Sequence, residues 1–306
     1  MPSRDQYIEA ATRENTRRSY RAALKHYEEE WGGLLPATAD SITRYLTDHA
    51  DTLSVNTLKQ RLAALARWHT DQGFPDPTKA PLVKTVLKGI RRLHPAVEKQ
   101  AKPLQLDELK AADDWLKGQL VAPTCDVVSR TRYTRDRALL LLGFWRGFRS
   151  DELCNLRIEH VTVRPGEAVT LHLPSSKGDR ENRGSSYHAP ALHQLCPVDA
   201  VNEWLTMVGC SNGPLFPSVD RWGNIADSSM NSGSINKWLR QLLHNAGVEA
   251  SEEYSSHSLR RGFAGWANAN HWDVKTLMQY VGWKDVQSAM RYVDGNDALE
   301  AFRTLI

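Results

Sequence analysis

A polar segment with a proline at each end, PAVEKQAKP at residues 95–103, most constrains how this chain can fold. It breaks a helical pattern that runs through the residues before it, as proline does. Polar residues between two prolines are typical of an interdomain linker. The 306 residues are enough for two domains of ordinary size. We therefore expect a first domain over residues 1–94, a linker over 95–104 and a second domain over 105–306.

The first domain is predicted to contain four helices between residues 14 and 94. Tyr20, Leu24, Tyr27 and Trp31 recur at intervals of three and four residues, which is helical spacing. Similar apolar stripes, preceded by capping residues, predict further helices near residues 42–46, 54–72 and 78–93.

The second domain mixes helices with a few strands. Helical patterns cover residues 106–116, 135–148, 198–207, 234–246, 257–268, 273–280 and 286–292. Strand patterns cover residues 158–163, 168–173 and 186–189, and a polar turn joins the last two. The expected fold class is mainly α with a small antiparallel β-sheet. The longest apolar run, residues 138–145, is predicted to be a core helix, because a membrane span takes about 20 residues.

Composition and charge are those of a globular protein with a basic first third. The chain is 41% hydrophobic and 25% charged, with a net charge of +3. Residues 1–104 contain 17 Lys and Arg against 12 Asp and Glu, so they carry +5, and the remainder carries +3 − 5 = −2. A basic surface would attract a phosphate backbone. A solvated helical surface without a nucleic-acid partner explains the same charge.

Cysteine usage and the start of the chain give no sign of metal binding or export. Cys125, Cys154, Cys196 and Cys210 form no Cys-x-x-Cys pair, and none stands at metal-finger spacing from a histidine. We interpret them as reduced, largely buried thiols. No signal peptide is recognisable. The expectation is a cytoplasmic protein with no membrane partner, no metal and no cofactor.

Five residues form a chemical set suited to breaking a phosphodiester bond. Arg149 and Arg260 supply guanidiniums, Lys177 an ammonium, His257 an imidazole and Tyr292 a phenol. Cleavage needs donors for the extra negative charge of the pentacoordinate phosphorus, and a guanidinium can grip two phosphate oxygens in one plane. A pairing of Arg149 with Glu152 or Asp151 on a surface turn is the structural alternative.

The order and spacing of these residues are specific. GFRSDEL at residues 147–153, HSLRRG at 257–262, VGWK at 281–284 and MRY at 290–292 resemble the conserved boxes of the tyrosine recombinases, the phage integrase family. The resemblance covers roughly residues 14–306. Trp283 stands 292 − 283 = 9 positions before Tyr292, the usual interval, and tryptophan there resembles the Cre-like branch.

This resemblance implies a fold and an activity. It implies a helical SAM-like core-binding domain followed by an α+β catalytic domain. The implied reaction is site-specific recombination through a 3′-phosphotyrosine and a Holliday junction, without metal or ATP. The implied partner is double-stranded DNA with inverted half-sites, bound by a dimer per site and a tetramer per synapse. Residues 297–306 would form a C-terminal docking helix on a neighbouring protomer, and packing within the same protomer is the alternative.

The resemblance also assigns roles within the site. Tyr292 would be the nucleophile, and His257 would accept its proton or hold a phosphate oxygen. Lys177 would be the general acid for the 5′-oxygen, although Arg180 or Arg183 could serve in its place. Trp283 would donate its indole N–H to a phosphate oxygen, or be a buried aromatic, or both. A further residue, Glu152, would orient Arg149 or His257.

DNA contacts outside the site are expected on the first and third helices of the first domain, again by resemblance. The candidates, each of which could equally be an ordinary exposed helix residue, are Arg17, Arg18, Asn56, Lys59 and Gln60.

Two other functions fit part of the pattern. One is a type IB topoisomerase, which uses related chemistry, and the other is a DNA-binding protein without catalysis.

Overall fold

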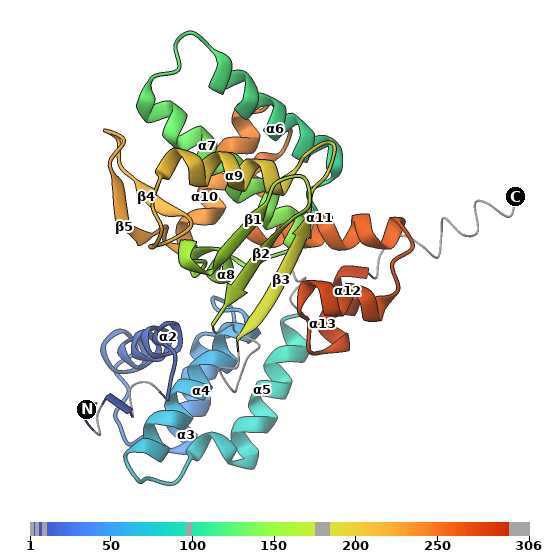
Figure 1. Ribbon diagram of the computed structural model, residues 1–306. Helices are drawn as coiled ribbons and strands as arrows, with labels where there is room; N and C mark the ends of the chain where they lie inside the picture. The colour runs from blue at the N-terminus through green and yellow to red at the C-terminus, as the bar shows by residue number, and fades with distance from the viewer. Residues whose placement is uncertain (1–2, 4–5, 8–10, 96–99, 175–183, 294–306) are drawn as a thin grey trace, which may run out of the picture. The chain divides into compact units, whose positions relative to one another are not determined.

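The computed structural model describes residues 3, 6–7, 11–95, 100–174 and 184–293, excepting the side chains of residues 288 and 291–293. It divides into two compact units, Met1–Lys99 and Gln100–Ile306 (Figure 1). Most of the described chain is helical and its sheets are small and antiparallel, which confirms the predicted fold class. Residues 96–99 of the predicted linker lie outside the described ranges.

The first unit contains helices at the four predicted places. These are α2 (Glu14–Lys25), α3 (Ala39–Asp48), α4 (Val55–Asp71) and α5 (Pro81–Leu93). A π-helical turn, His26–Glu30, continues α2. The side chains of Thr38 and Ser54 accept hydrogen bonds from the first turns of α3 and α4, as N-caps do.

The core of the first unit is built from these amphipathic faces. Tyr27 and Tyr45 are fully buried in it, with their rings 5.1 Å apart, and Leu58 and Ile90 bring α4 and α5 onto the same cluster. Burial of this apolar surface is what holds four short helices together.

The second unit contains the remaining helices. They are α6 (Leu106–Val121), α7 (Val127–Arg146), α8 (Ser150–Cys154), α9 (Pro197–Val208), α10 (Ile235–Asn245), α11 (Ser256–Ala269), α12 (Val274–Val281) and α13 (Val286–Val293). Helix α7 starts eight residues before the prediction, because Asp126 caps it by accepting from the Ser129 backbone N–H at 2.7 Å. Helix α8 was not predicted, since five residues are too few to show a period.

Helix α7 is the centre of this unit. Its last ten residues, 137–146, are all buried, so the helix is enclosed on every side, as predicted for residues 138–145. Helices α6, α9 and α11 pack around it. The end of α7 is therefore fixed by packing in the core, and it sets the starting position of the residues that follow.

A three-stranded antiparallel sheet lies beside α9, in the order β1 (Val161–Arg164), β2 (Ala168–Leu173), β3 (Ser185–Pro190). Two of the predicted strands are confirmed. The predicted strand over 158–163 was partly wrong, since Ile158–His160 is a 3₁₀ turn. A second hairpin, β4 (Pro217–Val219) with β5 (Ile225–Ser229), was not predicted.

Candidate active site

The turn that follows α7 sets the direction of the first arginine. Gly147 ends the helix in the left-handed region, with φ of 57°, and its N–H returns to the Phe144 carbonyl at 3.0 Å. This left-handed turn reverses the chain within two residues. Arg149 thereby becomes the N-cap residue of α8.

Glu152 fixes Arg149 by two hydrogen bonds. Its Oε2 accepts from the Arg149 backbone N–H at 2.8 Å, the second half of a capping box. Its Oε1 accepts from Nη1 of the Arg149 side chain at 2.7 Å. Glu152 is 6% exposed whereas the Arg149 side chain is 30% exposed, so the buried carboxylate leaves part of the guanidinium facing solvent.

Arg260, from the first turns of α11, approaches the same carboxylate. Its side chain is 1% exposed, and its Nη1 donates to the Gly147 carbonyl at 2.9 Å. The same Nη1 lies 3.5 Å from Oε2 of Glu152. One carboxylate therefore holds two guanidiniums that are 260 − 149 = 111 residues apart in sequence.

Trp283 covers the second guanidinium. Helix α12 ends at Gly282, whose φ of 77° is left-handed, and the Trp283 backbone N–H returns to the Met278 carbonyl at 2.8 Å. This cap turns the buried indole toward α11, where its ring centre lies 5.0 Å from Cζ of Arg260. The distance is that of a cation–π contact.

His257 lies one helical turn before Arg260 on α11, and its side chain is exposed. Tyr292 belongs to α13, which packs against α11. The Tyr292 side chain and the whole of Lys177 lie outside the described residues. Among the predicted site residues, the structure thus brings together Arg149, Glu152, Arg260 and Trp283, and carries His257 and Tyr292 on adjoining helices.

Aromatic side chains close to Arg146 and Arg260 were not predicted from the sequence. Tyr187, on β3, has its pKa raised by burial and then by the nearby Glu152 carboxylate. The cationic side chain of Arg146 is buried over this ring, and burial lowers its pKa. Arg146 is the sequence feature that could have indicated these contacts. It is a charged residue in an apolar helix, and it immediately precedes Gly147-Phe148-Arg149.

Comparison with known proteins decides the family. Residues 101–298 match the model described as "Phage integrase family". The chain belongs to this family. It is a tyrosine recombinase, an enzyme of site-specific DNA recombination, as the sequence predicted.

Individual relatives are similar over most of their length. This recombinase is 26% identical over 296 residues to an "Integrase/recombinase xerD homolog" of Selenomonas ruminantium, covering 94% of this chain and 83% of that protein. It is 24% identical over 294 residues to "Recombinase cre" of Escherichia phage P1, covering 92% and 82%. The crystal structure of XerH site-specific recombinase bound to palindromic difH substrate has the same fold, with a TM-score of 0.66 at 19% identity, covering 94% and 79%.

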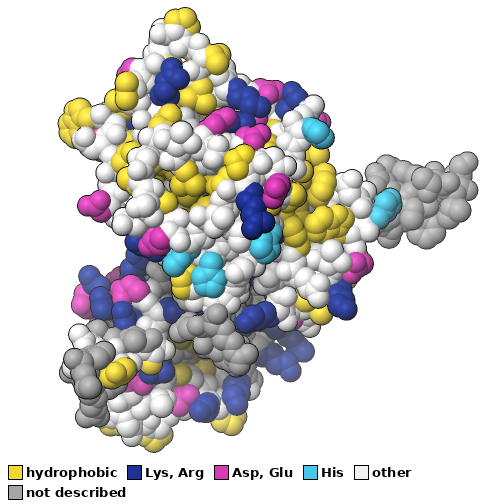
Figure 2. All heavy atoms as spheres, in the orientation of Figure 1, with side chains coloured by type: hydrophobic (Ala, Val, Ile, Leu, Met, Phe, Trp, Pro, Cys, Tyr) yellow, Lys and Arg dark blue, Asp and Glu magenta, His cyan; other side chains and the backbone are white. Residues whose placement is uncertain are grey.

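The DNA-contact candidates of the recombinase lie on α2 and α4 of the first unit. Lys and Arg side chains are visible on the surface of the molecule in Figure 2. Arg17 pairs with Glu14, and Nη2 of Arg18 donates to Asn15 at 3.2 Å. Asn56 and Lys59 are exposed. Gln60 is tied to α2 through hydrogen bonds to the Ser19 carbonyl and hydroxyl, at 3.1 and 2.8 Å.

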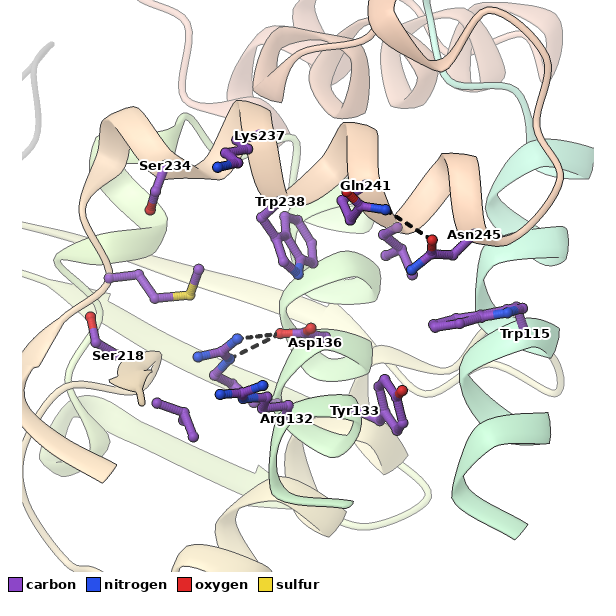
Figure 3. A pocket seen from close by; sticks show the side chains of 14 residues that line it. Trp115, Arg132, Tyr133, Asp136, Ser218, Ser234, Lys237, Trp238, Gln241 and Asn245 are labelled. Atoms are coloured by element: carbon purple, nitrogen blue, oxygen red, sulfur yellow. Dashed lines mark hydrogen bonds and ion pairs between the residues drawn. The ribbon is translucent and has the colours of Figure 1, made fainter. Parts of the chain in front are cut away.

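A cavity of about 640 Å³ opens on the first half of α7 (Figure 3). Residues 147–149 do not line it. Helices α6 and α10 and the β4–β5 hairpin complete its walls. Trp115, Tyr133 and Trp238 give it aromatic surfaces, while Arg132 and Lys237 give it positive charge. The buried Nε1 of Trp238 has no hydrogen-bond partner among the described residues.

Within the described ranges, no group of three or more His, Cys, Asp or Glu side chains is arranged to hold a metal ion. None of the helices described is both long and apolar enough to cross a bilayer.

Proposed function

We propose that this recombinase cuts and rejoins DNA strands through a covalent bond between Tyr292 and a 3′-phosphate, exchanging strands by way of a Holliday junction without metal or ATP. The observation that carries the proposal is the buried Glu152 carboxylate that holds Arg149 and Arg260 together. Two guanidiniums side by side, with a buried indole against one of them, form a site for a phosphate and not for a neutral substrate.

In this proposal the two arginines bind the nonbridging oxygens of the scissile phosphate. Each guanidinium stays protonated and presents its donors in a fixed plane. The negative charge on those oxygens grows as phosphorus becomes pentacoordinate, so donors already in position stabilise the transition state more than the ground state. Trp283, against Arg260, would add its indole N–H to the same oxygens.

Bond making and breaking fall to the remaining residues. The Tyr292 oxygen attacks phosphorus and the bond from phosphorus to the 5′-oxygen breaks. His257 takes the phenol proton, and Lys177 gives a proton to the departing 5′-oxygen. The reverse reaction, with the 5′-hydroxyl of another strand as nucleophile, reseals the DNA and needs no external energy source.

Covalent trapping tests this chemistry. A duplex nicked beside the scissile phosphate loses a short strand after cleavage, so wild type should accumulate as a protein–DNA adduct and Tyr292→Phe should not. The target would first be selected from random-sequence duplexes and searched for an inverted repeat. Adduct formation by Tyr292→Phe, or strong inhibition by EDTA, would refute the proposed mechanism. Relaxation of a plasmid that lacks the target would instead favour a topoisomerase.

We propose a dimer on each target site and a tetramer in the synapse. The related XerH structure holds a palindromic DNA substrate, which supports inverted half-sites. Arg17, Arg18, Asn56, Lys59 and Gln60 are proposed DNA contacts of the first unit, and the Gln60 side chain also donates a hydrogen bond to Ser19 of α2. Alanine at a phosphate contact should weaken binding of all sequences, whereas alanine at a base contact should relax the selected sequence at one position.

Residues 297–306 are proposed to dock on a neighbouring protomer, in the aromatic cavity of α6, α7 and α10. This segment combines apolar Leu299, Phe302, Leu305 and Ile306 with acidic Asp297 and Glu300. The cavity has the complementary character, with aromatic walls and cations from Arg132 and Lys237.

Native-gel analysis of DNA complexes tests this docking. Trp238→Ala and Phe302→Ala should both bind a single half-site normally and fail to form the larger complexes. Loss of those complexes with Phe302→Ala but not with Trp238→Ala would show that the segment docks elsewhere.

A further inference from the structure

A buried arginine outside the conserved boxes, Arg146, joins three segments of the catalytic unit. It is the last residue of α7 and is 2% exposed. Its Nη1 donates to the His188 carbonyl of β3 at 3.0 Å, and its Nη2 donates to the Tyr280 carbonyl near the end of α12. One planar group therefore cross-links the end of α7 to a strand and to a helix.

Aromatic rings surround this guanidinium. Its Cζ lies 3.8 Å from the ring centre of Tyr280, 5.1 Å from that of Tyr187 and 5.8 Å from that of Phe148. Each of these residues is next to a part of the site. Phe148 precedes Arg149, and Tyr280 stands three residues before Trp283.

Tyr187 completes the connection. An added Cβ on Gly282 would lie only 3.2 Å from the Tyr187 oxygen, so this phenol rests directly against the turn that presents Trp283. Its ring also packs on Phe148, with the ring centres 5.2 Å apart. The strand that carries Tyr187 follows the segment that contains Lys177.

The buried position of Arg146 is energetically unfavourable for a charged group. Among the described residues, no carboxylate oxygen lies within 4.0 Å of the Arg146 guanidinium, and its Nε makes no hydrogen bond to them. Burying a cation without a direct ion-pair partner costs folding free energy, and the charge of the more distant Glu152 offsets only part of the effect of burial on Arg146. The packing of the core therefore does not explain why an arginine occupies this place.

We propose that Arg146 is a positioning residue of the cleavage site. Its hydrogen bonds to two carbonyls and its contacts with three aromatic rings hold β3 and the end of α12 against the turn 147–149. Arg149, Arg260 and Trp283 thereby keep their positions relative to one another. It touches neither DNA nor the reacting atoms. The inference rests on the proposed cleavage function and adds to it a residue that acts through its neighbours.

Arg146→Met tests the proposal, because methionine is also unbranched and replaces the apolar stem of the arginine while removing both hydrogen bonds, the charge and the guanidinium contacts with the rings. Cleavage of the nicked duplex would be measured in a single turnover with enzyme in excess, at a temperature where circular dichroism shows the variant fully folded. We expect the cleavage rate to fall at least about 30-fold, while the affinity for the same duplex changes less than about threefold. Arg146→Lys should recover part of the rate, since it restores a cation and one donor.

Arg137→Met is the matched control. Arg137 is another buried arginine of α7, but it pairs with Asp113 and Glu203 far from the turn. Its replacement should lower the melting temperature and leave the cleavage rate of the folded protein unchanged. Wild-type cleavage by folded Arg146→Met, or equal slowing by both variants, would overturn the positioning role.

A readout without catalysis separates this inference from the proposed function. Hydrogen exchange of the free protein should show lost protection in Arg146→Met over residues 185–190 and 280–287, with α9 and α10 unchanged. Unaltered exchange in those two segments would reject the role of Arg146 even if cleavage were slow. If wild type formed no covalent adduct, the proposed cleavage function would be refuted. The hydrogen-exchange protection of the two segments would still show whether Arg146 holds them in place.

Discussion

The carboxylate of Glu152 lies 3.5 Å from Nη1 of Arg260 while its other oxygen accepts a hydrogen bond from Arg149 at 2.7 Å. All three groups meet at the turn that ends α7, and the Gly147 carbonyl provides a further acceptor for Arg260. The proposed phosphate site is thus assembled around a negative charge that binds no phosphate itself. Removing that charge should disturb both arginines at once.

Glu152→Gln keeps the shape of the side chain and removes the charge. A hydrogen bond to a charged group contributes about 1.5 to 3 kcal/mol, so cleavage should slow about 10- to 100-fold if that energy is lost in positioning the arginines. Single-turnover trapping on the nicked duplex measures the rate, and fluorescence anisotropy measures binding. Glu159→Gln is the control, since Glu159 is paired with Arg157 at the surface of the same unit. Equal rates for wild type and Glu152→Gln would refute the bridging role.

Arg149→Ala should abolish most cleavage and spare DNA binding. Removing one preorganised donor of developing charge costs about 3 kcal/mol, or at least about 100-fold in rate. Because the Arg149 side chain is 30% exposed, water can replace part of its contact with Glu152, so its removal should destabilise the fold less than removal of the buried Arg260. The checks are covalent trapping, anisotropy and thermal unfolding on one preparation. A parallel loss of affinity and rate would mean that Arg149 binds DNA without acting in the reaction.

Arg260→Ala should differ from Arg149→Ala in stability. Arg260 is almost fully buried, and its removal leaves the carboxylate of Glu152 with one cation fewer in a buried site. Breaking one side of a buried ion pair costs about 3 kcal/mol, so a clear fall in melting temperature should accompany the loss of cleavage. Differential scanning calorimetry of both variants makes the comparison. An unchanged melting temperature for Arg260→Ala would contradict the buried placement.

Local sequence patterns predicted much of the fold and the conserved boxes. The four helices of the first unit have clear apolar stripes, and α11 carries His257 and Arg260 one turn apart as expected. What the sequence could not give is contact across long separations. Glu152 was expected to orient Arg149 or His257, and its contact with Arg260 depends on α7 and α11 packing together.

Short elements and buried charges were missed for physical reasons. β4 has three residues and an irregular register with β5, so it shows no alternation. Arg146 interrupts an apolar helix, and its acceptors are 42 and 134 residues away in the sequence. A pattern within one helix cannot reveal partners at such distances.

The thiol of Cys154 should be unreactive in the folded protein. Burial raises its pKa from an ordinary value of 9.0 to about 11, so the reactive thiolate is scarce at pH 8. Cys210 is exposed and should be alkylated first by iodoacetamide, as mass spectrometry of peptides would show. Because the folded pKa is the higher one, this group stabilises the fold below about pH 9 and loses that contribution as the pH rises toward 11. Rapid labelling of Cys154 at pH 8 in native buffer would contradict its burial.

Gly262 should be irreplaceable even by alanine. A Cβ there would lie 1.9 Å from the carbonyl oxygen of Leu104, far closer than any real contact, so α11 and the segment before α6 must separate to admit it. The Leu104 backbone also donates to the Ser258 carbonyl at 3.0 Å, which keeps this segment pressed against α11. Elsewhere in a helix, glycine to alanine stabilises by about 1 kcal/mol.

Gly265, one turn further along α11, supplies the comparison, since an added Cβ would meet no atom within 4 Å. Gly265→Ala should therefore raise the free energy of unfolding by up to about 1 kcal/mol. Gly262→Ala should lower the free energy of unfolding by several kcal/mol or prevent folding. The added methyl group would clash with backbone atoms, which cannot move aside as a flexible side chain can. Urea unfolding of both variants measures the difference. Because α11 carries His257 and Arg260, any Gly262→Ala protein that folds should also cleave slowly, and normal stability in that variant would disprove the close approach of α11 to Leu104.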